Sequence, residues 1–429
     1  MRRVDWTSLS EAERADVLAR PDSVTDASVV ESVRTILADV KARGDAAVRD
    51  FTERFDGVRL EDFEVSEAEL VAALDLLTAE ERNALETAKA NIEVFHEPQR
   101  PAPYSVETMA GVVCRRIPKS LSSVGLYVPG GTAPLVSTVL MLAVPAAMAG
   151  VRDRVLVSPP GPDGKINKGV LAAARLCGVT RVFAVGGAQA IGATAYGTET
   201  VPKCAKIFGP GNAFVAAAKA MVSATPEGPA ADLPAGPSEA MVVADAGANP
   251  DFVAADLLSQ AEHDTDAQVI GVVDSVATAA AVEAAIAEQL PALPRHNIAA
   301  ASLESGRMIV APTGRFVDII DAYAPEHLIL QCKGADAIVE QLTNAGSVFV
   351  GPWTPESVGD YASGTNHTLP TGGAARAYSG VNLESFFKLV TVQKLSRDGL
   401  ERLGPTVERM AEMEGLEAHR RAVSLRLGS

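Results

Sequence analysis

The sequence predicts an α/β protein with two Rossmann-like doubly wound domains, mainly parallel sheets, a small N-terminal segment and a helical C-terminal tail. Its 429 residues exceed what one hydrophobic core usually organises. From about residue 122, short β-branched runs end in Gly or Pro and lead into alanine-rich helical segments, which is typical of parallel βα units. Two such series follow one another, so we expect two core-bearing domains.

The chain begins with a charged arm, residues 1–26. This arm has no continuous apolar stretch, so it does not have the pattern of a secretory signal. Residues 27–43 then place Val33, Leu37 and Val40 on one stripe of a helix that stops at Gly44. We expect this helix to pack against a core.

Residues 127–238 are predicted to form one Rossmann-like domain, together with a strand that starts just before them. The expected strands are 123–128, 154–158, 181–185 and 205–209, and the expected helices are 135–150, 167–177, 188–196 and 213–223. One doubly wound unit accounts for all of these elements.

The other Rossmann-like domain is expected to combine residues 27–126 with 239–380. Its strands are predicted at 239–245, 267–273, 307–311, 327–331 and 346–350, and its helices at 250–263, 275–289 and 334–343. The two series have similar spacing but share no residue-level repeat.

Residues 381–429 are predicted to form the helical tail. The pattern typical of a sheet stops after residue 381, and residues 404–427 have a helical pattern with Pro405 in the opening turn. We expect this tail to be an addition to the two domains.

Composition argues against several classes of partner. The net charge is −16 and no basic block interrupts it, so nucleic acid is not an expected partner. The most apolar stretch, residues 139–151, is shorter than a membrane-spanning helix and contains Pro145, so we expect a buried helix and no membrane. The four cysteines lie far apart without a CxxC pair, which fits a reducing cytoplasm.

Three glycine-rich turns follow predicted strands, at residues 129–134, 185–192 and 208–214. Such turns allow backbone N–H groups at the start of a helix to face an anion. None matches GxGxxG, because Phe214 stands where the third glycine belongs. A dinucleotide site and ordinary tight turns are both compatible with this pattern.

Several polar residues stand at the ends of predicted elements. Gln260 and His263 share one face at the end of a helix, where they could bind one ion or simply cap the helix. Glu326 and His327 precede a strand, so their side chains start on opposite sides unless the loop turns them together. The run 351–373 is longer than a plain connection requires and carries Asp360, Tyr361 and His367. His419 in the tail could be a functional residue or one packed at an interface.

Seven blocks, in this order and at this spacing, resemble the histidinol dehydrogenase family. The likeness extends from ARGDAAVRDFTERFDG to EGLEAHRRAV, which is nearly the whole chain. The blocks are SVGLYVPGGTAPLVSTVLM, GGAQAIGATAYGT, IFGPGN, DLPAGPSEAMVVAD, LLSQAEHD, YAPEHL and GTNHTLPT.

The resemblance implies an NAD-linked oxidation of L-histidinol through an aldehyde to L-histidine, the last steps of histidine biosynthesis. It implies one zinc ion per subunit, held by Gln260, His263 and Asp360 of one chain and His419 of the other. Imidazole and carboxylate suit zinc, whereas a neutral Gln is a weaker ligand, which suggests a site completed by the substrate. It also implies His327 as the base of the alcohol step and Glu326 as the activator of water.

Further positions match the family's binding residues. The resemblance implies a homodimer with shared active sites, because Glu414 and His419 would serve the partner's site. It implies NAD contacts from Tyr127, Gln189 and Asn212. The implied substrate-binding residues are Ser238, Gln260, His263, His327, Asp360, Tyr361, His367, Glu414 and His419.

Three rival functions remain distinct from this one. A thiol-based aldehyde dehydrogenase needs an activated cysteine, but no cysteine lies in a glycine-rich or histidine-bearing block. A related enzyme could act on another amino- or sulfo-alcohol, although the presence of His367, Glu414 and His419 together favours histidinol. A non-catalytic zinc protein would not need Glu326 beside His327.

Overall fold

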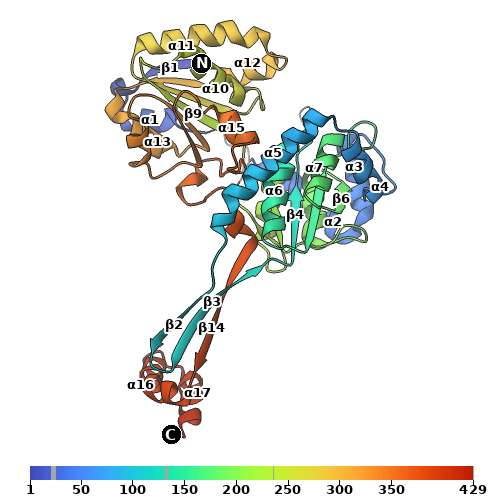
Figure 1. Cartoon of the computed structure of the whole chain (residues 1–429), viewed down its shortest axis with the longest axis vertical. Helices are drawn as coiled ribbons and strands as arrows, with labels where there is room; N and C mark the ends of the chain where they lie inside the picture. The colour runs from blue at the N-terminus through green and yellow to red at the C-terminus, as the bar shows by residue number, and fades with distance from the viewer. Residues whose placement is uncertain (21–25, 131–133, 235, 429) are drawn as a thin grey trace.

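Two α/β domains lie beside each other in the computed structural model, and a long arm leaves them with two helices at its tip (Figure 1). The structure describes residues 1–20, 26–130, 134–234 and 236–428, so residues 131–133 of the first glycine-rich turn lie outside it. Within these ranges, no helix is both long and apolar enough to cross a membrane. The predicted α/β class with mainly parallel sheets is confirmed.

The first domain is built on a six-stranded parallel sheet. Apolar side chains of α10, α11 and α12 cover one face of this sheet, and those of α1, α13 and α14 cover the other. The strand order is β1 (Arg2–Asp5), β11 (Arg307–Val310), β10 (Gln268–Val273), β9 (Glu239–Ala244), β12 (His327–Gln331) and β13 (Ser347–Val350). The helices are α1 (Glu11–Val17), α10 (Pro250–Ala261), α11 (Val276–Gln289), α12 (His296–Ser305), α13 (Phe316–Tyr323), α14 (Ala335–Val339) and α15 (Glu356–Tyr361).

The second domain is built on a five-stranded parallel sheet. One face is covered by α4, α5, α6 and α7, and the other by α2, α3, α8 and α9. The strand order is β6 (Arg181–Ala184), β5 (Asp153–Ser158), β4 (Ser123–Tyr127), β7 (Lys206–Phe208) and β8 (Ala230–Ala231). The helices are α2 (Ala27–Arg43), α3 (Asp45–Asp56), α4 (Glu67–Asp75), α5 (Ala79–His96), α6 (Val136–Met148), α7 (Lys168–Leu176), α8 (Gly187–Tyr196) and α9 (Ala213–Ser223).

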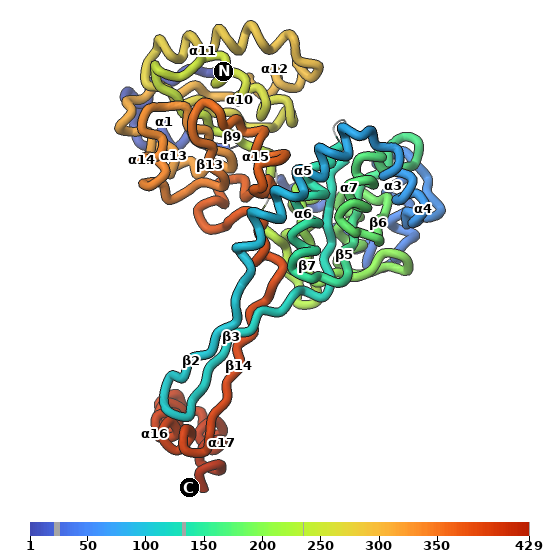
Figure 2. Tube along the Cα trace, in the orientation of Figure 1, coloured from blue at the N-terminus to red at the C-terminus, as the bar shows by residue number. Residues whose placement is uncertain are grey.

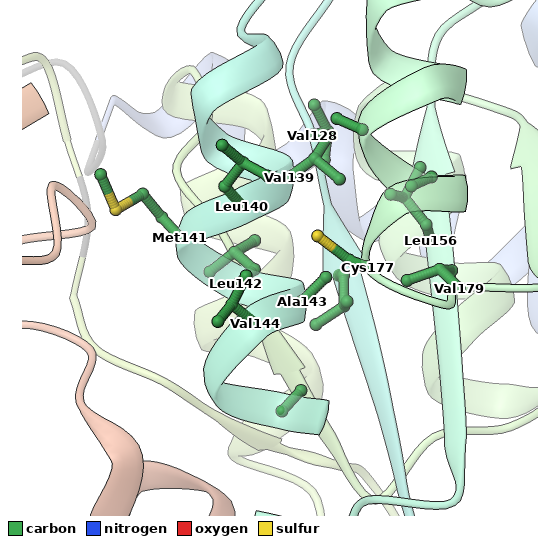
Figure 3. Packing of buried hydrophobic residues seen from close by; sticks show 14 of the residues in the cluster. Val128, Val139, Leu140, Met141, Leu142, Ala143, Val144, Leu156, Cys177 and Val179 are labelled. Carbon is green, nitrogen blue, oxygen red and sulfur yellow. The ribbon is translucent and has the colours of Figure 1, made fainter. Parts of the chain in front are cut away.

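Helix α6 is the apolar stretch that the sequence analysis expected to be buried, and this prediction is confirmed. Figure 3 shows its side chains among those of Val128, Leu156 and Cys177. Leu140 and Leu142 are almost completely buried. Each such side chain stabilises the fold by roughly 1.5–3 kcal/mol relative to an exposed one, so α6 anchors this face of the sheet.

The structure groups the N-terminal segments differently from the expected domain boundaries. Strand β1 pairs with β11, so the expected N-terminal segment, residues 1–26, begins as an edge strand of the six-stranded sheet. Helices α2 to α5 pack on the five-stranded sheet, although the expected boundaries grouped them with residues 239–380. These helices come before β4 in the chain, separated from it by residues 97–122.

The arm consists of strands that the sequence analysis did not predict. An antiparallel sheet joins β2 (Tyr104–Met109), β3 (Val112–Ser120) and β14 (Phe387–Leu395), so the expectation of no sheet after residue 381 was wrong. At its tip, α16 (Arg397–Met413) packs on α17 (Glu417–Leu427) (Figure 2). Ser396 caps α16 and Pro405 lies inside it, so the single helix expected from Pro405 was also wrong.

Candidate active site

Glu326 and His327 lie at the edge of the six-stranded sheet where its strands begin, which we call the amino edge. His327 is the first residue of β12, and both side chains are buried. Their side chains meet, with His327 Nδ1 3.6 Å from Glu326 Oε2. The two side chains meet although they are adjacent in the chain, because the turn before them is unusual. Ala324 in this turn adopts a left-handed conformation with φ of 56°.

The backbone of Glu239, the first residue of β9, contacts both side chains. Its N–H donates to Glu326 Oε2 at 2.9 Å. Its carbonyl oxygen lies 3.3 Å from His327 Nδ1. When the ring is neutral and its Nδ1–H donates to this carbonyl, Nε2 is the basic atom.

Carboxylates surround the His327 ring. Asp360 Oδ1 lies 3.3 Å from Nε2, and Glu356 Oε1 lies 3.9 Å from Nδ1. Burial alone would lower the pKa of His327, but Glu326, Glu356 and Asp360 raise it well above its usual value. Burial raises the pKa of Glu326 to about 8 and that of Glu356 to about 8. Perturbation of this kind is typical of sites that move protons.

Sequence analysis did not identify Glu356. It begins α15, and its side chain is 1% exposed although it is charged in water at neutral pH. Glu356 and Asp360 are four residues apart and therefore share one face of a helix. That spacing within the run 351–373 was the signal that could have found it.

A metal ion would fit beside this pair. His263, Glu356 and Asp360 each offer one ligand atom, and these atoms lie within 4.8 Å of one another. Gln260, one turn before His263, is completely buried, and neither atom of its amide has a hydrogen-bond partner among the described residues. A buried amide without partners is costly, and a cation would satisfy its oxygen.

Three other expected substrate residues lie near the cluster. His367 contacts both domains, Ser238 precedes β9, and Tyr361 ends α15. Burial lowers the pKa of His367 and keeps its ring neutral. The ring's Nδ1–H donates to the Asp360 carbonyl at 2.9 Å, and Nε2 lies 3.0 Å from the Thr138 hydroxyl of α6. Ser238 immediately precedes β9, and Tyr361 is 60% exposed at the end of α15. His367 therefore joins the amino edge to the other domain.

Glu414 and His419 are not brought to this cluster within one chain. Glu414 is the C-cap of α16 and His419 belongs to α17, at the tip of the arm (Figure 1). Both side chains are exposed. A site that uses these residues together with His263 must therefore take them from another copy of the chain.

The expected NAD residues lie at the edge of the five-stranded sheet where its strands end. Tyr127 ends β4, Gln189 lies in the first turn of α8, and Asn212 caps α9. Strands β4 and β7 are neighbours. The strand that follows β4 in the chain, β5, lies on one side of this pair, and the strand that follows β7, β8, lies on the other. This is the switch point at which open α/β sheets bind ligands.

A buried ion pair, also missed from the sequence, holds the turn after β7. Lys219 and Asp232 contact each other, with side chains 3% and 1% exposed. Lys219 Nζ donates to the Gly209 carbonyl at 2.8 Å, and the Gly209 N–H donates to Asp232 Oδ2 at 2.8 Å. Gly209 has φ of +123°, and a Cβ there would lie 2.1 Å from the Tyr127 carbonyl oxygen. The ion pair thus holds the backbone of Gly209 close to the backbone of Tyr127.

The cysteines do not have the environment of nucleophiles. Burial raises the pKa of Cys177 and Cys204 to about 12 and that of Cys332 to about 11. Cys114 lies on β3 of the arm. A thiolate is the reactive form, so these positions argue against the thiol-based rival.

Comparison with known proteins places this geometry in a family. The family profile described as histidinol dehydrogenase matches residues 19–427. A histidinol dehydrogenase from Xylella fastidiosa (strain Temecula1 / ATCC 700964) is 52% identical over 430 residues and covers 100% of both chains. One from Vibrio vulnificus (strain YJ016) is 51% identical over 428 residues, covering 100% of this chain and 98% of the relative.

A solved structure agrees with the sequence relatives. The crystal structure of histidinol dehydrogenase from Elizabethkingia anophelis has a TM-score of 0.94 and 44% identity to this chain. The match covers 100% of this chain and 98% of that one. The chain therefore belongs to the histidinol dehydrogenase family of oxidoreductases.

Proposed function

We propose that this protein oxidises L-histidinol through L-histidinaldehyde to L-histidine with two molecules of NAD, as the last steps of histidine biosynthesis. The observation that carries the proposal is the contact of Glu326 with His327 beside the His263 and Asp360 cluster. An acid-base pair and a cluster of metal-ligand type then lie together at the amino edge of the six-stranded sheet. We keep the cytoplasm as the expected compartment.

His327 acts in the alcohol step. Its Nδ1–H faces the Glu239 carbonyl, so Nε2 takes the proton of the substrate hydroxyl as the hydride leaves carbon. NAD, when bound, supplies the acceptor for that hydride. The product of this step is the aldehyde, which stays in the site.

Glu326 acts in the aldehyde step. Its Oε2 is held by the Glu239 N–H, so Oε1 takes a proton from the water that attacks the carbonyl carbon. The hydrated aldehyde then releases the second hydride and yields the carboxylate. Because burial raises the pKa of Glu326 to about 8, the carboxylate is a stronger base than an exposed one.

Gln260, His263 and Asp360, with His419 of the partner subunit, would hold zinc. When bound, zinc supplies a Lewis acid that anchors the substrate's amino and imidazole nitrogens. Ser238, Tyr361, His367 and Glu414 of the partner subunit complete the proposed substrate pocket. Tyr127, Gln189 and Asn212 are the proposed NAD contacts.

The shared site requires a homodimer, and the tip of the arm supports one. Several apolar side chains are exposed around Glu414 and His419, with Met410 58%, Met413 76% and Leu425 70% exposed. Exposed apolar patches of this kind mark interaction surfaces. We propose that the partner subunit covers them.

The yield of NADH per L-histidinol tests the proposed reaction. With limiting L-histidinol and excess NAD, we expect about two NADH for each substrate, since two hydrides leave one carbon. A yield of about one would mean that the reaction stops at the aldehyde. Turnover of another amino- or sulfo-alcohol, but not of L-histidinol, would refute the substrate assignment.

A further inference from the structure

An ion pair between Arg20 and the buried carboxylate of Glu239 adjoins Glu326 and His327. Arg20 donates twice to the Glu239 carboxylate, from Nε to Oε2 at 2.5 Å and from Nη2 to Oε1 at 2.9 Å. The two side chains are 18% and 2% exposed. The backbone of the same Glu239 contacts both Glu326 and His327. Arg20 therefore holds Glu239, whose backbone contacts Glu326 and His327.

Arg20 also holds the turn that leads into the pair. Its Nη2 donates to the carbonyl oxygen of Tyr323 at 2.8 Å and lies 3.3 Å from that of Ala324. Ala324 is the only residue other than glycine with positive φ in the described part of the chain. Such a conformation persists only where its surroundings enforce it. The chain reaches Glu326 two residues later.

Tyr323 completes the network. The Arg20 guanidinium carbon lies 3.7 Å from the centroid of the Tyr323 ring. The Tyr323 hydroxyl donates to Gln268 Oε1 at 2.7 Å and lies 3.1 Å from Glu239 Oε2. Gln268 Nε2 in turn donates to the Ala19 carbonyl at 3.1 Å, next to Arg20. The network thus connects the N-terminal segment with the starts of β9 and β10.

We infer that Arg20 is a positioning residue for the reaction. Its guanidinium holds both the Glu239 side chain and the turn at Ala324. Because the Glu239 backbone and this turn set the positions of Glu326 and His327, Arg20 helps to determine where the two side chains lie. This inference rests on the proposed roles of those two residues. Arg20 touches neither of them, and it does not contact Gln260, His263 or Asp360. Its loss should therefore slow chemistry more than it weakens substrate binding.

Stability alone is a weaker explanation for the pair. A buried ion pair often stabilises a fold no more than apolar residues of similar volume, because desolvation offsets the attraction. Lysine carries the same charge, but it cannot donate in the planar fork that spans a carboxylate and backbone carbonyls. Arg20→Lys therefore separates charge from geometry.

The test measures kcat, KM for L-histidinol, zinc content and the thermal midpoint of Arg20→Lys. We expect kcat to fall on the order of 10–100-fold, as for a small misplacement of reacting groups. KM should stay within about threefold, and zinc content should be unchanged. The matched control is Arg3→Lys, because Arg3, on β1 of the same sheet, also pairs with a glutamate, Glu283 of α11, but at the surface.

Two further variants keep the test decisive if Arg20→Lys folds poorly. Arg20→Met with Glu239→Gln removes both charges of the pair, so stability should recover while kcat stays low. Wild-type kcat in that double variant, or in folded Arg20→Lys, would overturn the inference. Glu326→Gln and His327→Asn are assayed in parallel. If they lose activity and the Arg20 variants do not, only the positioning role fails. If they stay active, the proposed function itself fails.

Discussion

A mixture of two inactive variants should regain activity if the active site is shared between chains. His263 follows α10 at the amino edge of the six-stranded sheet, whereas His419 lies on α17 at the tip of the arm. In a twofold dimer of His263→Ala with His419→Ala, one site carries both defects. The other site carries neither.

The expected magnitude follows from this arrangement. With random pairing, about half of the dimers are mixed, and half of the sites in each mixed dimer are intact. The mixture should therefore regain about a quarter of wild-type activity, and purified heterodimers about half. Each variant refolded alone should remain nearly inactive, because every one of its sites lacks one zinc ligand.

The assay is refolding of the mixed, unfolded chains, followed by separation of heterodimers through two different affinity tags. NADH formation from L-histidinol is then measured. His296→Ala is the matched control, because His296 is exposed on α12 and its Nδ1 lies 3.0 Å from the nearby Leu293 carbonyl oxygen. That variant should stay active by itself. Purified heterodimers that are as inactive as their parents would refute the shared site.

Three other outcomes are expected. Removal of metal by a chelator should abolish turnover, and added zinc should restore it while NAD binding persists throughout, since the proposed ligands lie apart from Tyr127, Gln189 and Asn212. Glu326→Gln should slow oxidation of L-histidinaldehyde on the order of 10²–10⁴-fold and the alcohol step less, because an amide cannot take a proton from water. Lys219→Met should raise KM for NAD and cost about 3–5 kcal/mol of stability, because Asp232 is left buried without its partner.

Each of these outcomes has a result that contradicts it. Full activity in protein shown to be free of metal would exclude zinc as an essential component. Equal losses in single turnovers of L-histidinol and L-histidinaldehyde would assign Glu326 to general positioning. An unchanged unfolding midpoint and an unchanged KM for NAD in Lys219→Met would mean that the ion pair does not hold the Gly209 turn.

The helices and strands of both domains were largely predictable from local sequence. The β-branched runs ending in Gly or Pro correctly indicated β4, β5, β9 and β10, because a strand buried on both faces needs a continuous apolar segment. The arm was not predictable in this way. Strand β14 is exposed along most of its length and is stabilised by pairing with β3, more than 260 residues earlier in the chain. Its sequence, FKLVTVQKL, mixes apolar and polar residues, and most of its side chains stay exposed, so no pattern of burial marks it as a strand.

The sequence by itself determined the chemical identity of most of the candidate site, through the motifs that carry Gln260, His263, Glu326, His327 and Asp360. Only the tertiary structure decided how they meet. A side chain's neighbours across a sheet depend on strand order and on turns such as that at Ala324, and neither is encoded in local periodicity. For the same reason no sequence pattern marked Arg20, and only the four-residue spacing from Asp360 could have indicated Glu356. Each is one charged residue among many until folding brings Glu356 to His327 and Arg20 to Glu239.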